Sequence, residues 1–456
     1  MRPEPFLGGD TCLTLPPSLS STFSMSPAAS KLTPDRRRQA RRDATYSALF
    51  GTIPTLLLDN SAVIITYIAL LGGGNMFSML SSSLISIAST LLLLPMVGFT
   101  EKLGLKASVR VAGYLGCATY MLMAAAPFFG SFASPLVIIA AFAFCLTNPL
   151  YVNAWYPLLD GFLLPQERSH FFGQMRFLYQ LLSSALFLLL GLLMGKNPPL
   201  WFFQIIIVLV AISLLGRSHY IDRLPLTSDK PVKSRYNFRS AFKIAIRNGP
   251  LVGFSVYVCF VSLGYTSIIP LVYIYMKSHL ELPPNMVVSI SSLTMIGIMV
   301  GYLCASSLQR LLGTKWLQIL CHLCFIAVSL ACFCCGKESG NVILKFALLL
   351  MIQGFATACF GVCFSTETLA LASPGNKTMA SAFCNTYSSA GHSVGRLGTS
   401  LVLGSMLLAP SWQLGTRVVS SFQTLFLIYA VWLIFCLLLL VLLPAVVPVH
   451  EDYYQP

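Results

Sequence analysis

Long apolar segments alternate with short polar connections along most of this chain. Each segment has about 20 residues, the length that crosses the roughly 30 Å hydrocarbon core of a bilayer. Backbone N–H groups in lipid must be hydrogen-bonded within the protein, so segments of this length favour helices. The pattern predicts twelve membrane-spanning helices, at residues 46–71, 75–97, 107–129, 134–159, 175–195, 199–216, 250–276, 286–308, 316–335, 342–367, 379–405 and 421–447.

The twelve segments form two sets of six, separated by a polar, basic stretch. We therefore predict an all-α polytopic membrane protein built from two six-helix bundles. The tail before the first segment is rich in Ser, Pro and Thr, a composition typical of disorder. The predicted divisions are a disordered basic tail (1–44), a first bundle (45–216), a central loop (217–249), a second bundle (250–447) and a short end (448–456).

Charge agrees with a membrane protein and indicates its orientation. Only 10% of residues are charged, yet the net charge is +14. Of the 29 Lys and Arg, 23 lie in the tail, the central stretch and alternate connections, all on one predicted side. By the positive-inside bias, this side is cytoplasmic and holds both termini, and the charge is not a nucleic-acid footprint. Short connections and the lack of a signal peptide favour a bacterial inner membrane.

Three connections resemble those of a known family. Residues 101–106, Glu-Lys-Leu-Gly-Leu-Lys, are similar to the acidic-basic-x-Gly-x-basic loop of the major facilitator superfamily, with Glu in place of Asp and Leu105 in place of a basic residue. Residues 310–315 repeat the Gly and a basic residue without the acid. Residues 165–176 are similar to the family's Pro-x-Glu-x-Arg-Gly-x-Phe-Phe-Gly-x-x-Arg connection, with Ser169 in place of Gly.

This resemblance implies two bundles around a central cavity that opens alternately to each side. It also implies a latch, in which Glu101 lies against the positive N-terminal end of helix 11 in the other bundle, worth about 0.3–1 kcal/mol when exposed. A solvated tight turn is the alternative. The residues predicted for gating are Glu101, Lys102, Gly104, Lys106, Asp160, Arg168 and Glu367.

Ionisable groups at membrane depth are costly, and each one is a hypothesis about function. Asp59 lies near the middle of the first segment. It can load and release a proton as its surroundings change, or it can simply pair with Arg396. His392 precedes Arg396 by one helical turn and is the second candidate for ion coupling. Arg396 suits an anionic solute, and a helix-to-helix ion pair is the alternative.

Polar and aromatic residues within the segments predict the walls of the cavity. Asn148, Asn153, Trp155 and Tyr156 share a segment with two prolines, which indicates a bent helix lining a cavity. Trp155 and Tyr156 can instead be ordinary interfacial aromatics. The predicted cavity residues are Asn60, Asn148, Asn153, Trp155, Tyr156, Arg176, Tyr265, Gln353, Asn385 and Arg396.

Small residues and cysteines have structural interpretations. Gly297 with Gly301, and Gly391 with Gly395, have the spacing that allows helices to pack closely. Most of the 14 cysteines lie inside predicted spans, where Cys behaves as a small hydrophobe. We therefore predict no metal site and no cofactor.

The sequence lacks the motifs of two rival classes. It has no G-x-x-x-x-G-K-[ST] and no H-E-x-x-H, which argues against ATP-driven transport and zinc-dependent hydrolases. The form G-x-S-x-G occurs at residues 391–395, but inside a predicted membrane span rather than at the strand-to-helix turn that the hydrolase motif needs. The sequence predicts a monomeric secondary active transporter that moves a small organic solute through the lipid bilayer, coupled to H+. A facilitated uniporter and a transporter-like receptor are the alternatives.

Overall fold

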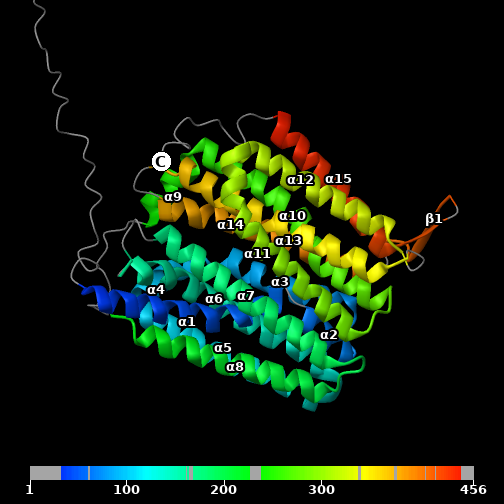
Figure 1. Ribbon diagram of the computed structural model, residues 1–456, viewed down its shortest axis with the longest axis horizontal. Helices are drawn as coiled ribbons and strands as arrows, with labels where there is room; N and C mark the ends of the chain where they lie inside the picture. Colours follow the sequence, from blue (N-terminus) through cyan, green and yellow to red (C-terminus); the bar gives the residue numbers. More distant parts are fainter. Residues whose placement is uncertain are drawn as a thin grey trace, which may run out of the picture.

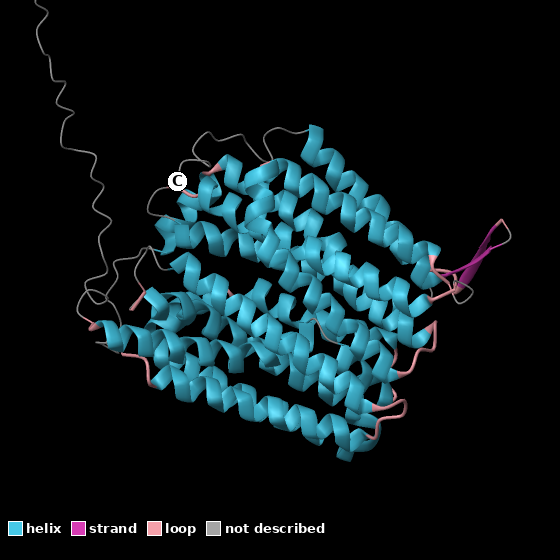
Figure 2. Cartoon of the chain, viewed as in Figure 1, coloured by secondary structure: helices cyan, strands magenta, loops and turns pink. Residues whose placement is uncertain are grey.

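The computed structural model describes residues 32–59, 62–160, 162–163, 168–225, 238–336, 340–373, 377–405, 407–415 and 417–442. Within these ranges almost the whole chain is helical, and the strands are confined to one short hairpin (Figure 2). The all-α polytopic fold predicted from the apolar segments is therefore confirmed.

The first half of the chain forms the lower bundle in Figure 1. Proline and glycine mark several of its boundaries: Pro95 begins one helix, and Gly130 has a φ of 56° inside a 3₁₀ turn. Its elements are α1 (Pro34–Asp59), α2 (Ala62–Leu70), α3 (Asn75–Leu92), α4 (Pro95–Leu103), α5 (Leu105–Ala125), η2 (Ala126–Phe132), α6 (Ala133–Asp160), α7 (Arg168–Met194) and α8 (Leu200–Asp222).

The second half forms the upper bundle and ends with the hairpin and a last helix (Figure 1). Asn248 caps one of its helices by accepting a hydrogen bond from the Leu251 N–H. Its elements are α9 (Phe238–Arg247), α10 (Gly249–Ser278), α11 (Pro284–Leu312), α12 (Thr314–Cys334), α13 (Val342–Leu371), α14 (Lys377–Gly404), β1 (Ser411–Leu414), β2 (Arg417–Ser420) and α15 (Ser421–Leu442).

The two bundles meet along two helix pairs, α3 with α14 and α7 with α11. We call the end of the molecule where α4 meets α5 and where α9 lies the basic end. It is at the left in Figure 1, and the β1–β2 hairpin lies at the right, at the opposite end. The second and eleventh predicted spans, residues 75–97 and 379–405, therefore face each other.

Nine stretches of the described chain are long and apolar enough to span a bilayer, and α1 with α2 makes a tenth if this bent pair is one span. One of the nine, Leu105–Trp155, contains both α5 and most of α6. The 28-residue α14 is absent from the nine because it is rich in Ser, Thr and Gly. The total of twelve spans stays a prediction.

Three boundaries differ from those expected. The predicted disordered tail extends to residue 44, but α1 begins at Pro34, and Ala40, Asp43 and Ala44 on it are buried. The sixth span continues to Asp222 instead of ending at 216. The central stretch contains α9, whose Phe242 packs on Phe383 with ring centroids 6.1 Å apart. In all three places charged residues that lie within a helix were interpreted as part of a tail or loop.

The glycines of the two matching connections adopt the same backbone conformation. Gly104 joins α4 to α5 with φ 90° and ψ 152°, and Gly313 joins α11 to α12 with φ 81° and ψ 160°. This region of φ and ψ is essentially restricted to glycine. The internal repeat inferred from the sequence is thus present in the backbone itself.

We expect Gly104→Ala and Gly313→Ala each to lower the free energy of unfolding by about 1–3 kcal/mol, because alanine must adopt a strained conformation there. Unfolding in detergent, followed by circular dichroism, measures this. Gly253→Ala is the matched control, since Gly253 is helical and nothing lies within 4 Å of a Cβ built on it. Equal effects at all three positions would contradict the conformational explanation.

Close packing at the predicted glycine pairs is confirmed. A Cβ built on Gly297 would lie 2.1 Å from the Met351 carbonyl oxygen, which places α11 directly against α13. A Cβ built on Gly391 would lie 2.1 Å from the Cys259 carbonyl oxygen, which does the same for α14 and α10. Glycine at these positions lets the backbones touch.

Candidate functional site

Arg396 lies at the junction of the two bundles. Its side chain is only 4% exposed, and its Nη1 donates to Asp59 Oδ1 on α1 and to the Ser82 carbonyl oxygen on α3, each at 2.5 Å. Its Nε donates to the Thr266 carbonyl oxygen on α10 at 3.2 Å. The guanidinium, which belongs to α14, therefore links four helices, two from each bundle. Its contact with Asp59 is the helix-to-helix ion pair given above as the alternative to a solute contact.

Asp59 differs from its partner in being accessible. Its side chain is 31% exposed, although the arginine beside it is buried. It is the last residue of α1, where the first span bends by 54° into α2. A broken helix commonly carries ion and solute sites, because backbone groups are freed at the break.

Three further predicted residues gather one turn away. The Tyr265 ring on α10 lies edge-on to the His392 ring, with centroids 6.1 Å apart. The buried Gln353 on α13 donates from Nε2 to the Tyr265 carbonyl oxygen at 3.0 Å. We call Asp59, Tyr265, Gln353, His392 and Arg396 the central polar cluster.

Two atoms of this cluster are shielded from solvent and have no hydrogen-bond partner. They are Nε2 of His392 and Oε1 of Gln353. Orphaned buried polar atoms are costly, and they are often explained by a water, ion or ligand. The cluster can therefore hydrogen-bond to something that enters between the bundles.

Direct hydrogen bonds join the bundles at the end opposite the basic end. Lys277 Nζ donates to the Thr66 carbonyl oxygen at 3.1 Å, and Ser278 Oγ donates to Asn75 Oδ1 at 2.6 Å. Ser400 Oγ adds a bond to the Met76 carbonyl oxygen at 2.8 Å. This end is closed by contacts from α2 and α3 to α10 and α14.

Other contacts join the bundles from mid-helix toward the basic end. Gln180 Nε2 donates to the Met295 carbonyl oxygen at 3.2 Å, and Thr90 Oγ1 lies 3.3 Å from Ser393 Oγ. Nearer the basic end, the Arg176 guanidinium lies over the Tyr302 ring at 5.8 Å. Asn385 there is exposed and bonds to Ser381 of its own helix.

A pocket of about 160 Å³ lies in the first bundle toward the basic end. It contains two predicted cavity residues, Trp155 and Arg176, so both belong to one site. We call this the polar pocket; its lining residues are Ala48, Thr52, Tyr151, Trp155, Met175, Arg176 and Tyr179.

Two other predicted cavity residues lie on the same helix, α6. Asn153 Nδ2 donates to the Leu93 carbonyl oxygen at 3.0 Å, which ties α6 to the end of α3. Asn148 is half-buried and is not part of the polar pocket. Asn148 and Asn153 thus do not line one common site.

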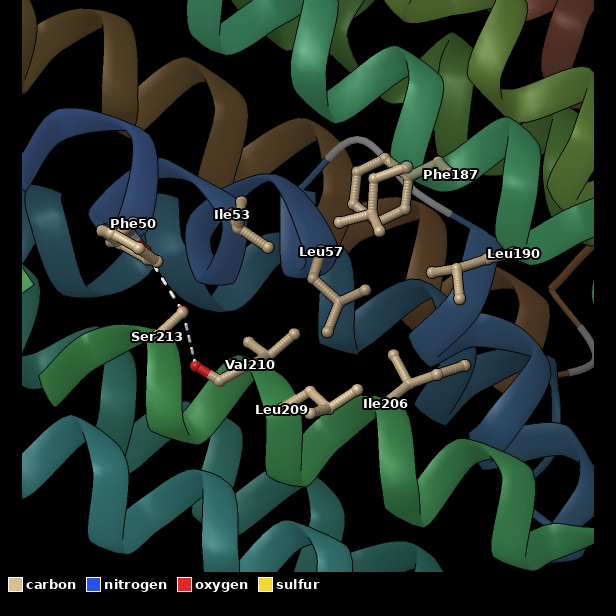
Figure 3. Close-up of a pocket in the computed structure, with 10 residues that line it drawn as sticks. Phe50, Ile53, Leu57, Phe187, Leu190, Ile206, Leu209, Val210 and Ser213 are labelled. Atoms are coloured by element: carbon tan, nitrogen blue, oxygen red, sulfur yellow. Dashed lines mark hydrogen bonds between the residues drawn. The ribbon is translucent and has the colours of Figure 1, made fainter. Parts of the chain in front are cut away.

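A larger pocket, of about 240 Å³, is almost entirely apolar (Figure 3). It lies among α1, α7 and α8 and is lined by residues such as Phe50, Leu57 and Val210, with Ser213 Oγ turned to the Phe50 carbonyl oxygen. Leu209 on its wall is 61% exposed. An apolar groove with exposed leucines suits lipid chains rather than a polar solute.

The Major Facilitator Superfamily profile matches residues 44–396 of the sequence. The chain belongs to the major facilitator superfamily. None of the curated protein sequences compared with it matches significantly. It is therefore an integral, multi-pass membrane protein of a transporter family.

Solved structures share the fold at low sequence identity. The nucleoside transporter NupG has a TM-score of 0.65 at 15% identity, over 90% of this chain and 98% of that one. A D-xylose-proton symporter has 0.67 at 12%, over 88% and 97%. A bacterial homologue of the iron transporter ferroportin, in its inward-facing state, has 0.64 at 10%, over 89% and 98%. Such different cargoes on one superfamily fold mean that the site, not the fold, must indicate the solute.

The described residues of the predicted latch stay within their own bundles. Lys106 Nζ donates to the carbonyl oxygens of Asp222 and Leu224, at 3.1 and 2.8 Å, and so binds the C-terminal end of α8. Lys102 is exposed, Gly104 forms the turn, and Glu367 on α13 is fully buried. Several predicted residues lie outside the described ones: Asn60 altogether, and the side chains of Glu101, Tyr156, Asp160 and Arg168.

Arg217 is the site residue that sequence reasoning missed. It was counted as a charge of the central loop, but it lies on α8 with 2% exposure, and its guanidinium is 4.3 Å from the Tyr151 ring centroid. Its burial could have been predicted, because Arg217 continues the stripe of Ile207, Val210 and Leu214 at helical spacing. Arg217 belongs to the first bundle, as do the residues of the polar pocket, and it covers the ring of Tyr151 in the wall of that pocket.

Proposed function

We propose that this protein is a secondary active transporter that moves a small organic solute by alternating access, with coupling to protons. The observation that carries the proposal is the Asp59–Arg396 ion pair, which joins the bundles while the carboxyl group remains 31% exposed. Similarity to a nucleoside transporter and to a D-xylose-proton symporter supports a small polar solute.

Protonation of Asp59 would convert the ion pair into an ordinary hydrogen bond. Removing one charge of a buried pair leaves the other uncompensated, which is strongly unfavourable. The contact between α1 and α14 would then weaken, and Arg396 would seek another acceptor. Because His392 lies one turn away with a free, shielded Nε2, it is our second candidate for holding the proton.

We propose further that the basic end faces the cytoplasm of a bacterial cell, by the positive-inside bias. The hydrogen bonds from Lys277 and Ser278 then close the outer side, and the conformation is inward-facing. The latch predicted at Glu101 would act in the opposite conformation, when the basic end closes.

The test begins with a solute and continues with transport. Thermal unfolding of the purified protein with nucleosides, sugars, amino acids and organic acids identifies a ligand, since a ligand at 100 times its Kd stabilises the native state by about 2.7 kcal/mol. Uptake of that ligand into proteoliposomes is then measured with and without an imposed pH gradient. We expect wild-type protein to accumulate it against its gradient only when the pH gradient is present.

We expect Asp59→Asn to abolish this uphill uptake and to retain exchange of the solute across the membrane, because the amide cannot carry the proton. Asp222→Asn is the matched control, since Asp222 pairs with Arg110 at 3.6 Å on the surface and is 45% exposed. Unchanged uphill uptake by Asp59→Asn would refute the role of Asp59. Gradient-independent uptake by the wild type would identify a uniporter.

A further inference from the structure

The Arg217 side chain crosses from an outer helix toward the interior of the first bundle. Its path runs through a notch in α1: a Cβ built on Gly51 would lie 2.3 Å from Arg217 Cδ. Only the missing side chain of Gly51 lets the arginine pass. Beyond the notch its guanidinium stacks on the ring of Tyr151, at 4.3 Å from the centroid.

No carboxylate of the described residues forms an ion pair with this guanidinium. Ser47 bonds to the Arg217 carbonyl oxygen rather than to its side chain, and Arg217 Nε is buried without a partner. Asp43 lies eight residues before Gly51 on α1, about 12 Å along the helix. A buried, unpaired charge is expensive, and a cation–π contact offsets only part of that cost.

The arginine reaches the wall of the polar pocket. Tyr151, whose ring it covers, lines that pocket, and Thr52 next to Gly51 also lines it. The same pocket is lined by Arg176, with Trp155 and Tyr179. A second guanidinium, a hydroxyl group and aromatic faces thus surround a space of about 160 Å³.

We propose that the polar pocket binds the anionic group of a small organic solute, a carboxylate or a phosphate ester, with Arg217 as its buried counter-charge. The inference rests on the proposed function and names its substrate class. Guanidinium groups match the two-oxygen geometry of such anions, and the aromatic rings suit an organic body. Arg396 does not serve this role here, because Asp59 and two carbonyl oxygens already occupy it.

The test is direct binding, with benzoate and its neutral analogue benzamide as probes. We expect benzoate, and also phenyl phosphate, to raise the unfolding temperature of the purified protein, and benzamide to leave it unchanged. Arg217→Gln should weaken binding of benzoate by about tenfold or more, as the loss of a charge-assisted contact implies. Arg217→Lys should bind more tightly than Arg217→Gln, because it keeps the charge.

Arg223→Gln is the matched control. Arg223 follows directly after α8 and also lies over a tyrosine ring, Tyr220, at 5.5 Å, but it is exposed and outside the pocket. We expect this variant to bind benzoate like the wild type. A benzoate effect equal in wild type and Arg217→Gln would overturn the proposal and leave Arg217 with a packing role.

Two further arms keep the proposal testable if Arg217→Gln does not fold. Gly51→Ala keeps the arginine but fills its notch, so we expect it to weaken benzoate binding too, and unchanged binding would count against the site. If phosphatidylglycerol raises the unfolding temperature, Gly51→Ala reduces that rise and benzoate gives none, the pocket holds a lipid headgroup and the solute assignment is wrong. If the wild type binds no anion but accumulates a neutral solute uphill, this inference is refuted and the proposed function stands.

Discussion

Arg396→Met is expected to lower the free energy of unfolding by roughly 3–5 kcal/mol, the cost of removing one partner from a buried ion pair. The change leaves Asp59 without its counter-charge and removes the donor that holds α3 and α10 against α14. Unfolding by sodium dodecyl sulfate in mixed micelles, followed by circular dichroism, measures the difference from wild type.

The double variant Asp59→Leu with Arg396→Met separates the ion pair from simple packing. Replacing both members of a buried pair by apolar residues is often neutral or stabilising, so we expect it to recover much of the lost stability. Arg110→Met is the control: Arg110 and Asp222 are 43% and 45% exposed, and such a pair contributes about 0–1 kcal/mol. Equal losses for Arg396→Met and Arg110→Met would show that the central pair does not hold the bundles together.

The sequence singled out each member of the central polar cluster as a candidate site residue because polar residues are conspicuous within apolar membrane spans. A charged residue among twenty apolar ones must have a partner, and Asp59 and Arg396 are such residues. Their pairing was one of two alternatives, since helical spacing shows which face of a helix a residue occupies but not which helix it meets. That His392 and Gln353 share Tyr265 as a neighbour likewise depends on how α10, α13 and α14 pack.

Near the basic end, the sequence did not reveal the buried arginine. An arginine there can either mark the cytoplasmic side of the membrane or lie inside the bundle, and both cases look the same in the sequence. The arginines at 36, 37, 38, 41, 42, 217 and 239 all count toward membrane orientation, and of these only Arg217 is buried. Topology counting treats them alike. The hairpin of β1 and β2 was missed for another reason: its strands have four residues each, with Gly415 at φ 62° between them, too short for a clear alternation.

Gly395→Leu is expected to prevent the second bundle from packing. A Cβ built on Gly395 would lie 2.1 Å from the Leu263 carbonyl oxygen, which belongs to the backbone of α10. The backbone cannot move aside as a flexible side chain does, so α10 and α14 must separate. We expect a loss larger than the roughly 1–3 kcal/mol of ordinary overpacking. The yield of monodisperse protein after extraction, and its unfolding in detergent, report it.

Gly398→Leu is the control on the same helix. Gly398 lies three residues further along α14, is exposed, and has nothing within 4 Å of a built Cβ. Leucine also has the higher helix propensity, so this variant should fold at least as well as the wild type. Both variants add the same side chain to α14. The two positions differ in that Gly395 lies against the backbone of α10 and Gly398 does not. Normal folding of Gly395→Leu would mean that α10 and α14 are not in contact there, and the position of Arg396, one residue further on, would then be in doubt.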